Sequence, residues 1–316
     1  MNELTIVVGI YLYIDVEDCR NVFIVKENGF LHEYTLDYFS YAVSNILVGK
    51  NISSPSLELR GGYIKFITGS DMGIAVTGNG RLKINNREMD LWRCLPVRKN
   101  MRVEVESINH SSIVYISFTG DIKNMFEGAL APGKVELDDL GRDFNDFLKE
   151  IDARYLPPKY IPSMSDDLEI RVLFLSSLDY DENIFGKEYI LSKDSFKNFI
   201  LKPVKITDGD GRNKIIMISK SGAVQIFSKD YDEGLPLMAQ ILPEDLDNIA
   251  RINGDCRVKL NVIDPESARI EMRKYRMKIE NILRIINLAV AAVRNGAKKI
   301  RVKLGESIYD AWIEEI

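Results

Sequence analysis

Few side chains in this sequence of 316 residues are of the types that most often do nucleophilic or metal chemistry. There are two histidines, His32 and His110, and three cysteines, Cys19, Cys94 and Cys256. The cysteines form no C-x-x-C pair and have no zinc-ligand spacing, which favours buried thiols in a reducing compartment. Two histidines exclude a histidine-rich metal centre, so we expect no metal site. Any general base should then be a carboxylate or a lysine.

Three short motifs contain residue types that bind or react, and each also has a structural interpretation. Glu17-Asp18 is either a pair of catalytic carboxylates or part of a solvated acidic loop, and the loop is favoured. Residues 208–212 read Asp-Gly-Asp-Gly-Arg, but their spacing differs from that of a calcium-binding loop, so a turn is favoured. Gly78-Asn79-Gly80 is expected to form a hairpin turn rather than a phosphate-binding loop, because no helix follows it.

Composition limits the class of partner. The chain has 47 acidic and 42 basic residues, a net charge of −5, which disfavours nucleic acid as a ligand. The apolar run at residues 4–14 is about eleven residues long and has no basic flank, which is too short for a membrane span and unlike a signal peptide. We therefore expect a cytoplasmic protein that binds neither nucleic acid nor membrane.

The elements that must position any site are mainly strands. Alternating runs such as residues 63–67 and 102–106 predict half-buried strands, and glycine and asparagine pairs between such runs predict tight turns. Residues 37–48 are the main exception, because Phe39, Ala42, Val43 and Ile46 share one face of a helix. The first part of the chain is thus expected to be a β-barrel closed by one helix.

The second part repeats this plan. Strand patterns begin near residue 169 and end near 263, with a short helix at residues 243–250. Asp264 and Pro265 then start a long helix that Asn295-Gly296 ends, and residues 299–313 form a hairpin. We expect a first barrel at residues 1–156, a linker at 157–168, a second barrel at 169–264, and the helix and hairpin at 265–316.

The order of several motifs resembles one protein family. In sequence they are Asp37, residues 45–49 (Asn-Ile-Leu-Val-Gly), Leu57-Glu58, Val76-Thr77-Gly78, Trp92, residues 114–122 and, more weakly, residues 222–225, 233–241 and 253–258. This order is similar to subunit 2 of allophanate hydrolase, the KipA/PxpC family, which is related to the carboxyltransferase part of urea carboxylase. The resemblance implies two tandem cyclophilin-like β-barrel domains.

The resemblance also implies partners and chemistry. Family members work with a subunit 1 of the KipI/PxpB type, and a PxpA-like subunit is a further candidate partner. Their substrates are small amides such as 5-oxoproline or urea, and the cofactors would be ATP through partner subunits or carboxybiotin. The substrate-binding candidates that the family positions imply are Glu58, Gly222, Gln225 and Gly234. Glu58 would face either the pocket or an ion pair, and no catalytic residue is assigned.

Departures from the family pattern allow a second interpretation of the function. The glycine- and arginine-rich family segments are replaced at residues 13–21, 123–131 and 193–199, and one glycine pair is reduced to Gly234. Such residues bind carboxylates or allow backbone N–H groups to approach them. The chain is therefore either a divergent subunit of a 5-oxoprolinase or biotin-dependent carboxyltransferase complex, or a non-catalytic binding or regulatory subunit that keeps the fold.

Overall fold

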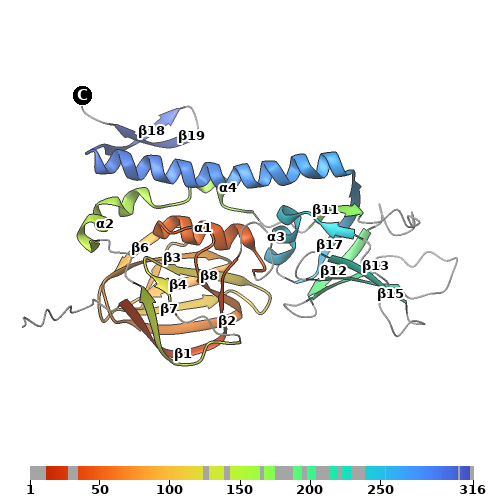
Figure 1. Ribbon diagram of the computed structural model, residues 1–316, viewed down its shortest axis with the longest axis horizontal. Coiled ribbons are helices and arrows are strands. Elements are labelled where there is room, and N and C mark those ends of the chain that lie inside the picture. The colour runs from red at the N-terminus through yellow and green to blue at the C-terminus, as the bar shows by residue number, and fades with distance from the viewer. Residues whose placement is uncertain are drawn as a thin grey trace, which may run out of the picture.

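The protein has two β-rich lobes, and one long helix lies across both of them (Figure 1). The computed structural model describes residues 12–27, 35–123, 128–138, 143–163, 167–174, 188–193, 198–203, 214–219, 223–228, 239–252, 254–304 and 307–313. We call the part from β1 to the 3-10 helix η1 the first lobe, and the part from β11 to β17 the second lobe.

The first lobe contains a ten-stranded sheet with antiparallel pairing. Its strands are β1 (Leu12–Val25), β2 (Ser56–Thr68), β3 (Met72–Gly78), β4 (Gly80–Ile84), β5 (Arg87–Met89), β6 (Cys94–Val97), β7 (Arg102–Ser107), β8 (Ile113–Phe118), β9 (Asp121–Ile122) and β10 (Gly133–Asp138). The order is β5-β4-β7-β2-β1-β10-β9, while β8 joins β2 to β3, and β3 also pairs with β6.

The sheet curls because β2 changes partner along its length. Its first half pairs with β8 and its second half with β7. Gly61 lies at the change with φ +57°, and a Cβ there would lie 2.2 Å from the carbonyl oxygen of His110. Glycine is the residue that tolerates both conditions. Gly78-Asn79-Gly80 marks a similar change, since β3 and β4 do not pair with each other, so the expected hairpin turn is wrong.

Helix α1 (Tyr38–Val48) forms where it was predicted and is buried along its whole length. The Asp37 side chain caps it by accepting from the Ser40 amide at 3.1 Å. Gly49 ends it with φ +79°, and its N–H returns to the Ile46 carbonyl at 3.0 Å. After the first sheet come α2 (Phe144–Glu150) and the 3-10 helices η1 (Ile151–Ala153) and η2 (Pro158–Tyr160).

The second lobe is a closed barrel, with strands in the order β11-β16-β15-β14-β13-β12-β17. They are β11 (Asp167–Phe174), β12 (Glu188–Lys193), β13 (Asn198–Pro203), β14 (Lys214–Ser219), β15 (Ala223–Ser228), β16 (Ala239–Ile241) and β17 (Cys256–Ile263). The barrel closes by the parallel pairing of β11 with β17. Helix α3 (Pro243–Arg251) connects β16 to the segment before β17.

Helix α4 (Pro265–Arg294) begins as the sequence predicts, because the Asp264 carboxylate accepts from the amides of Glu266 and Ser267 at 3.0 and 2.9 Å. Its predicted apolar stripe, including Tyr275, Ile279 and Ile286, is buried in one cluster with α1. The hairpin of β18 (Lys298–Leu304) and β19 (Ser307–Ile313) lies at its end (Figure 1). The predicted mainly β fold with barrel-like lobes, long helix and hairpin is confirmed, while the domain boundaries stay a prediction.

A buried ionic network joins the two lobes. Asp247 of α3 accepts from the backbone amides of Tyr38 and Phe39, at 2.7 and 3.1 Å, at the start of α1. Arg251 of α3 donates to both carboxylate oxygens of Asp37, at 2.6 and 2.8 Å. The Tyr275 hydroxyl of α4 donates to Asp247. We call Asp37, Asp247, Arg251 and Tyr275 the inter-lobe network.

Removing the arginine of this network should destabilise the protein strongly. Arg251→Ala would leave two buried carboxylates without their cation, which costs about 3–5 kcal/mol of unfolding free energy. Urea denaturation would measure the change. The control is Arg273→Ala on the exposed side of α4, where we expect a change within about 0.5 kcal/mol. Equal effects of the two variants would contradict the network's role.

Candidate functional site

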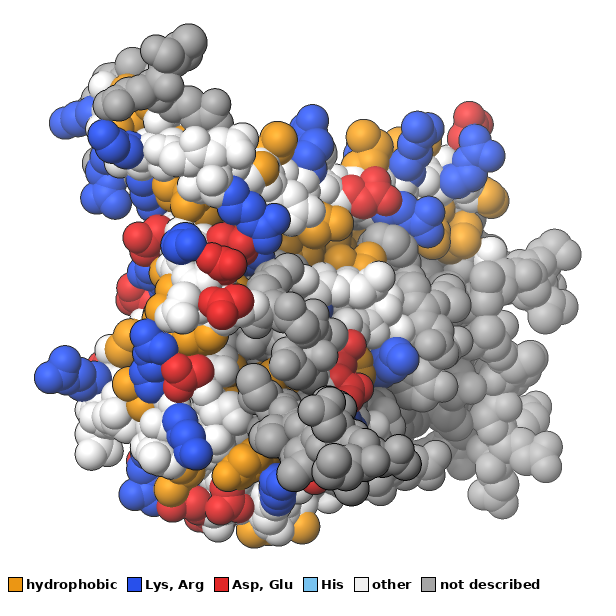
Figure 2. All heavy atoms as spheres, turned by 60° about the vertical axis from the view of Figure 1, so that its left-hand side comes forward, with side chains coloured by type: hydrophobic (Ala, Val, Ile, Leu, Met, Phe, Trp, Pro, Cys, Tyr) orange, Lys and Arg blue, Asp and Glu red, His pale blue; other side chains and the backbone are white. Residues whose placement is uncertain are grey.

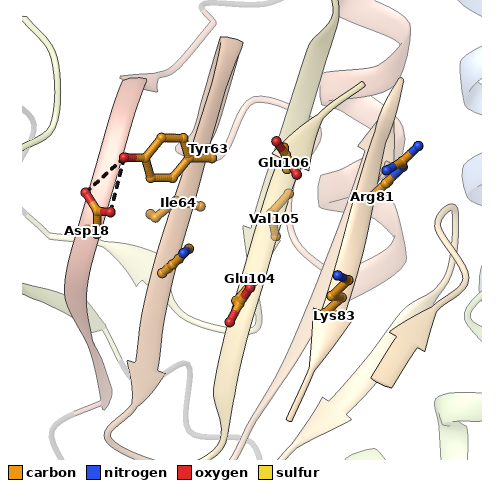
Figure 3. A pocket seen from close by; sticks show the side chains of 9 residues that line it. Asp18, Tyr63, Ile64, Arg81, Lys83, Glu104, Val105 and Glu106 are labelled. Carbon is orange, nitrogen blue, oxygen red and sulfur yellow. Dashed lines mark hydrogen bonds between the residues drawn. The ribbon is translucent and has the colours of Figure 1, made fainter. Parts of the chain in front are cut away.

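A charged hollow on the outer face of the first lobe is the best candidate binding site. Its volume is about 290 Å³. Its walls come from four neighbouring strands, β1, β2, β7 and β4 (Figure 3). The lining residues are Asp18, Tyr63, Ile64, Lys65, Arg81, Lys83, Glu104, Val105 and Glu106. Ile64 and Val105 are buried, so the polar side chains of the hollow rest on the apolar core of the sheet.

Strand register arranges these side chains in two rows of mixed charge. One row runs across the strands as Asp18, Lys65, Glu104 and Lys83. The other runs as Arg20, Tyr63, Glu106 and Arg81. Opposite charges directly across a strand pair attract weakly, by about 0.2–1 kcal/mol, so the rows also stabilise the sheet.

The aromatic ring at the edge of the hollow is held by its neighbours. The Tyr63 hydroxyl donates to the two carboxylate oxygens of Asp18, at 3.2 and 3.1 Å, and this bond raises the pKa of the Tyr63 hydroxyl. The Arg20 guanidinium lies 5.3 Å from the centre of the same ring. Beside the hollow, Glu17 forms an ion pair with Arg102 at 2.7 Å. Glu17-Asp18 thus lies on a strand, which corrects the favoured loop.

Glu58, a predicted substrate-binding residue, is fully buried in the first lobe. Its Oε2 accepts from the Tyr115 hydroxyl at 2.5 Å and from the Leu36 amide at 3.1 Å. Its Oε1 pairs with Arg60 at 2.5 Å. Of the two roles expected for Glu58, the structure therefore shows the ion pair. These bonds hold the segment that enters α1, since the Asp37 amide in turn donates to Tyr115.

Of the other predicted site residues, the structure describes Gln225, which belongs to the second lobe, whereas Glu58 belongs to the first. Gln225 lies on β15, opposite Met217 of β14. Gly222 and Gly234 lie outside the described residues, as do His32 and residues 208–212. The role of all four candidates in substrate binding stays a prediction.

The motif residues that carried the family resemblance build the frame of the first lobe. Asn45 is buried, and its side-chain oxygen accepts from the hydroxyls of Ser56 and Ser117 at 3.1 and 2.9 Å. Its amide nitrogen donates to the Ser54 carbonyl at 2.9 Å. The Thr77 hydroxyl donates to the Ser40 carbonyl of α1 at 2.7 Å. These side chains fix α1 on the sheet rather than point into the hollow.

Sequence reasoning missed two kinds of polar residue. Arg81 and Lys83, with Glu104 and Glu106, follow the period of a strand, and that alternation was the available signal that they share an exposed face. Lys50 directly follows the Gly49 cap and is buried, with its Nζ 3.1 Å from Asp121 and 2.9 Å from the Pro55 carbonyl. No local pattern signals the ion pair, because Asp121 is far from Lys50 in the chain.

The described residues contain neither a metal-binding cluster nor a membrane-spanning helix. No group of three or more His, Cys, Asp and Glu side chains there is placed to hold a metal ion. In the same residues, no helix combines the length and the apolar character needed to cross a membrane. Cys94 and Cys256 are buried, and Cys19 is partly buried.

Part of the first lobe matches a known family of protein domains. Residues 35–127, which span α1 and most of the first sheet, match the family model described as "Carboxyltransferase domain, subdomain A and B". This match agrees with the order of motifs that resembles allophanate hydrolase subunit 2, a family related to the carboxyltransferase part of urea carboxylase. No curated protein matches the chain.

Solved structures show the same fold at low sequence identity. The urea carboxylase of Kluyveromyces lactis is 16% identical, with a TM-score of 0.64, and the match covers 86% of this chain and 29% of that one. The urea amidolyase of K. lactis is 15% identical, with a TM-score of 0.64 and coverage of 85% and 20%. TTHA0988 is 15% identical, with a TM-score of 0.59 and coverage of 79% and 55%. The chain thus spans between a fifth and about half of these proteins.

The buried lysine predicts a pH dependence of stability. Burial lowers the pKa of Lys50 to about 8, although Asp121 acts in the opposite direction. Above that pH the unfolded chain binds more protons than the folded one, so stability should rise with pH between about 8 and about 10.5. Relative to Lys50→Met, the wild-type unfolding free energy should rise by up to about 1.4 kcal/mol per pH unit there. Denaturation at several pH values measures this.

The matched control is Lys83→Met, because Lys83 is exposed. The difference between wild type and Lys83→Met should lack the rise with pH that we expect for Lys50→Met. A flat difference for Lys50→Met as well would mean that the folded protein does not lower the pKa of Lys50.

Proposed function

We propose that the chain is the small-molecule-binding subunit of a carboxyltransferase-type complex, and that the charged hollow holds a small amide bearing a carboxylate, with 5-oxoproline as the leading ligand. The observation that carries this proposal is the arrangement of cations and carboxylates around one hollow. Arg81 and Lys83 stand two residues apart on β4 and face the same side (Figure 3). Glu106 and Glu104 lie directly opposite them on β7.

This arrangement matches the polar groups of such a ligand. A guanidinium binds a carboxylate through two parallel hydrogen bonds, which gives Arg81 the role of carboxylate anchor. A lactam N–H needs an acceptor, which Glu104 or Glu106 supplies, and a lactam oxygen needs a donor, which Lys83 supplies. Urea has no carboxylate and would bind more weakly. The chemical step belongs to the assembled complex, with ATP or carboxybiotin supplied through partner subunits.

The partners in this proposal are a subunit 1 of the KipI/PxpB type and, as a further candidate, a PxpA-like subunit, acting in the cytoplasm. The family match of residues 35–127 and the urea carboxylase-like fold support this assembly. A specific observation favours a second candidate function, a regulatory subunit without a substrate. Glu58, the acidic residue of the Leu57-Glu58 motif, makes its hydrogen bonds and its ion pair inside the fold.

Calorimetry with 5-oxoproline tests the binding site directly. Arg81→Gln should weaken binding at least about tenfold, because the loss of one charge-assisted hydrogen bond costs about 1.5–3 kcal/mol. Arg87→Gln is the matched control, since Arg87 is exposed on the adjacent β5 and does not line the hollow. Equal affinities for the two variants would place the ligand elsewhere.

A second measurement separates the two candidate functions. The chain and its subunit 1-like partner would be co-expressed and assayed for ATP-dependent cleavage of 5-oxoproline. Turnover that Arg81→Gln reduces supports the substrate-binding subunit. No turnover with any partner, together with no binding of 5-oxoproline or urea, leaves the regulatory subunit as the function.

A further inference from the structure

An apolar groove lies at the C-terminal end of α4, on different elements from the charged hollow. Its volume is about 390 Å³. It runs between α4, the chain that follows η1 and strand β19. Ile285, Leu288, Ala289 and Ala292 line it from α4, opposite Tyr155 and Trp312. All ten lining residues are apolar or aromatic, although Leu288 is 63% exposed.

The surroundings of this groove are basic, in a chain whose net charge is −5. On α4, Arg284 directly precedes the lining residues Ile285 and Ile286, and Arg294 follows Ala292 and forms an ion pair with Glu150. Strand β18 adds Lys298, Lys299, Arg301 and Lys303, with one acidic residue, Asp310, opposite in β19. The Lys299 Nζ lies 4.2 Å from the centre of the Tyr155 ring and 5.9 Å from that of Trp312, at the edge of the groove. Figure 2 shows Lys and Arg side chains gathered around the hairpin end of the molecule.

We propose that this groove is the docking site for an acidic amphipathic helix of a partner protein. Apolar side chains on one face of that helix would fill the groove, as in other helix-in-groove complexes. Carboxylates beside that face would meet the cations of α4 and β18, which speeds association and fixes the orientation of the partner. The proposal goes beyond the small-molecule site, because the groove and the hollow share no residue.

The other possible occupants fit these observations less well. A second copy of the chain would bring its own basic α4 and β18 against the same cations. Nucleic acid would meet the charges but has no apolar side chains for a groove lined by leucine, isoleucine and alanine. A flat lipid surface would not fill the groove, which is enclosed by three elements. An acidic helix satisfies both the shape and the charge.

Fluorine NMR provides a readout confined to the groove. The chain has two tryptophans, Trp92 and Trp312, so labelling with fluorotryptophan gives two signals that Trp312→Phe assigns. The probe is a synthetic helical peptide with leucines on one face and glutamates beside them. We expect it to shift the signal of Trp312, which lines the groove, more than that of Trp92, whose carbonyl accepts from the Leu156 amide beside the groove. A peptide with lysines in place of the glutamates should not shift either signal.

Two exposed positions of α4 give matched variants. Leu288→Glu places a carboxylate in the groove and should weaken peptide binding about tenfold or more. Ile270→Glu makes the same change at an exposed residue of the first turns of α4 and should leave binding unchanged. Both residues are exposed, so both variants should fold, which urea denaturation checks.

Several outcomes would overturn the proposal. They are binding that Leu288→Glu and Ile270→Glu affect equally, no shift of Trp312 with the acidic peptide, and an equal shift with the lysine peptide. A dimer in sedimentation that Leu288→Glu dissociates would assign the groove to a second copy. A Trp312 shift with phosphatidylserine vesicles and none with the acidic peptide would assign it to a lipid surface.

Discussion

The structure depends on one interaction above others: a helix of the first lobe is capped by a side chain of the second. The first amides of a helix have no partner within it. In α1, the amides of Tyr38 and Phe39 donate to Asp247 of α3, more than two hundred residues away. The helix is buried throughout, so water is not available to replace that carboxylate. Arg251 then balances the charge by binding Asp37, and α4 closes the network through Tyr275.

The network stabilises a fold whose sequence lacks several motifs of the family that it resembles. Burial and the nearby Asp37 raise the pKa of Asp247, while Arg251 opposes them, so each group depends on the geometry of the others. Further hydrogen bonds within the first lobe hold α1 and the segment before it. They are made by Glu58, Tyr115, Asn45 and Thr77. These buried polar residues thus stabilise the fold. Among the described residues, the two candidate surfaces for ligands are the charged hollow on the outer face of the sheet and the apolar groove beside α4.

Sequence patterns predicted the elements whose causes are local. Helices α1, α3 and α4 follow from cap residues and periodic apolar positions, and the β18–β19 hairpin follows from a turn between two strand patterns. The hairpin predicted at Gly78-Asn79-Gly80 was wrong. The same turn residues occur in a hairpin and at a point where the chain passes to a different strand partner. The network and the Lys50–Asp121 pair could not be predicted, since they join segments distant in the chain. For the hollow, the alternation of Arg81 and Lys83 was visible, but the register that sets them beside Glu104 and Glu106 was not.

The central claim is that the two lobes form one unit because Asp247 caps α1. Hydrogen exchange of the Tyr38 and Phe39 amides tests it most directly, since these two donors exchange only when the cap opens. The account predicts that they exchange as slowly as the central amides of β2, with the free energy of global unfolding. Fast exchange of these two amides while β2 stays protected would show that the lobes separate in the folded protein, and would contradict the account.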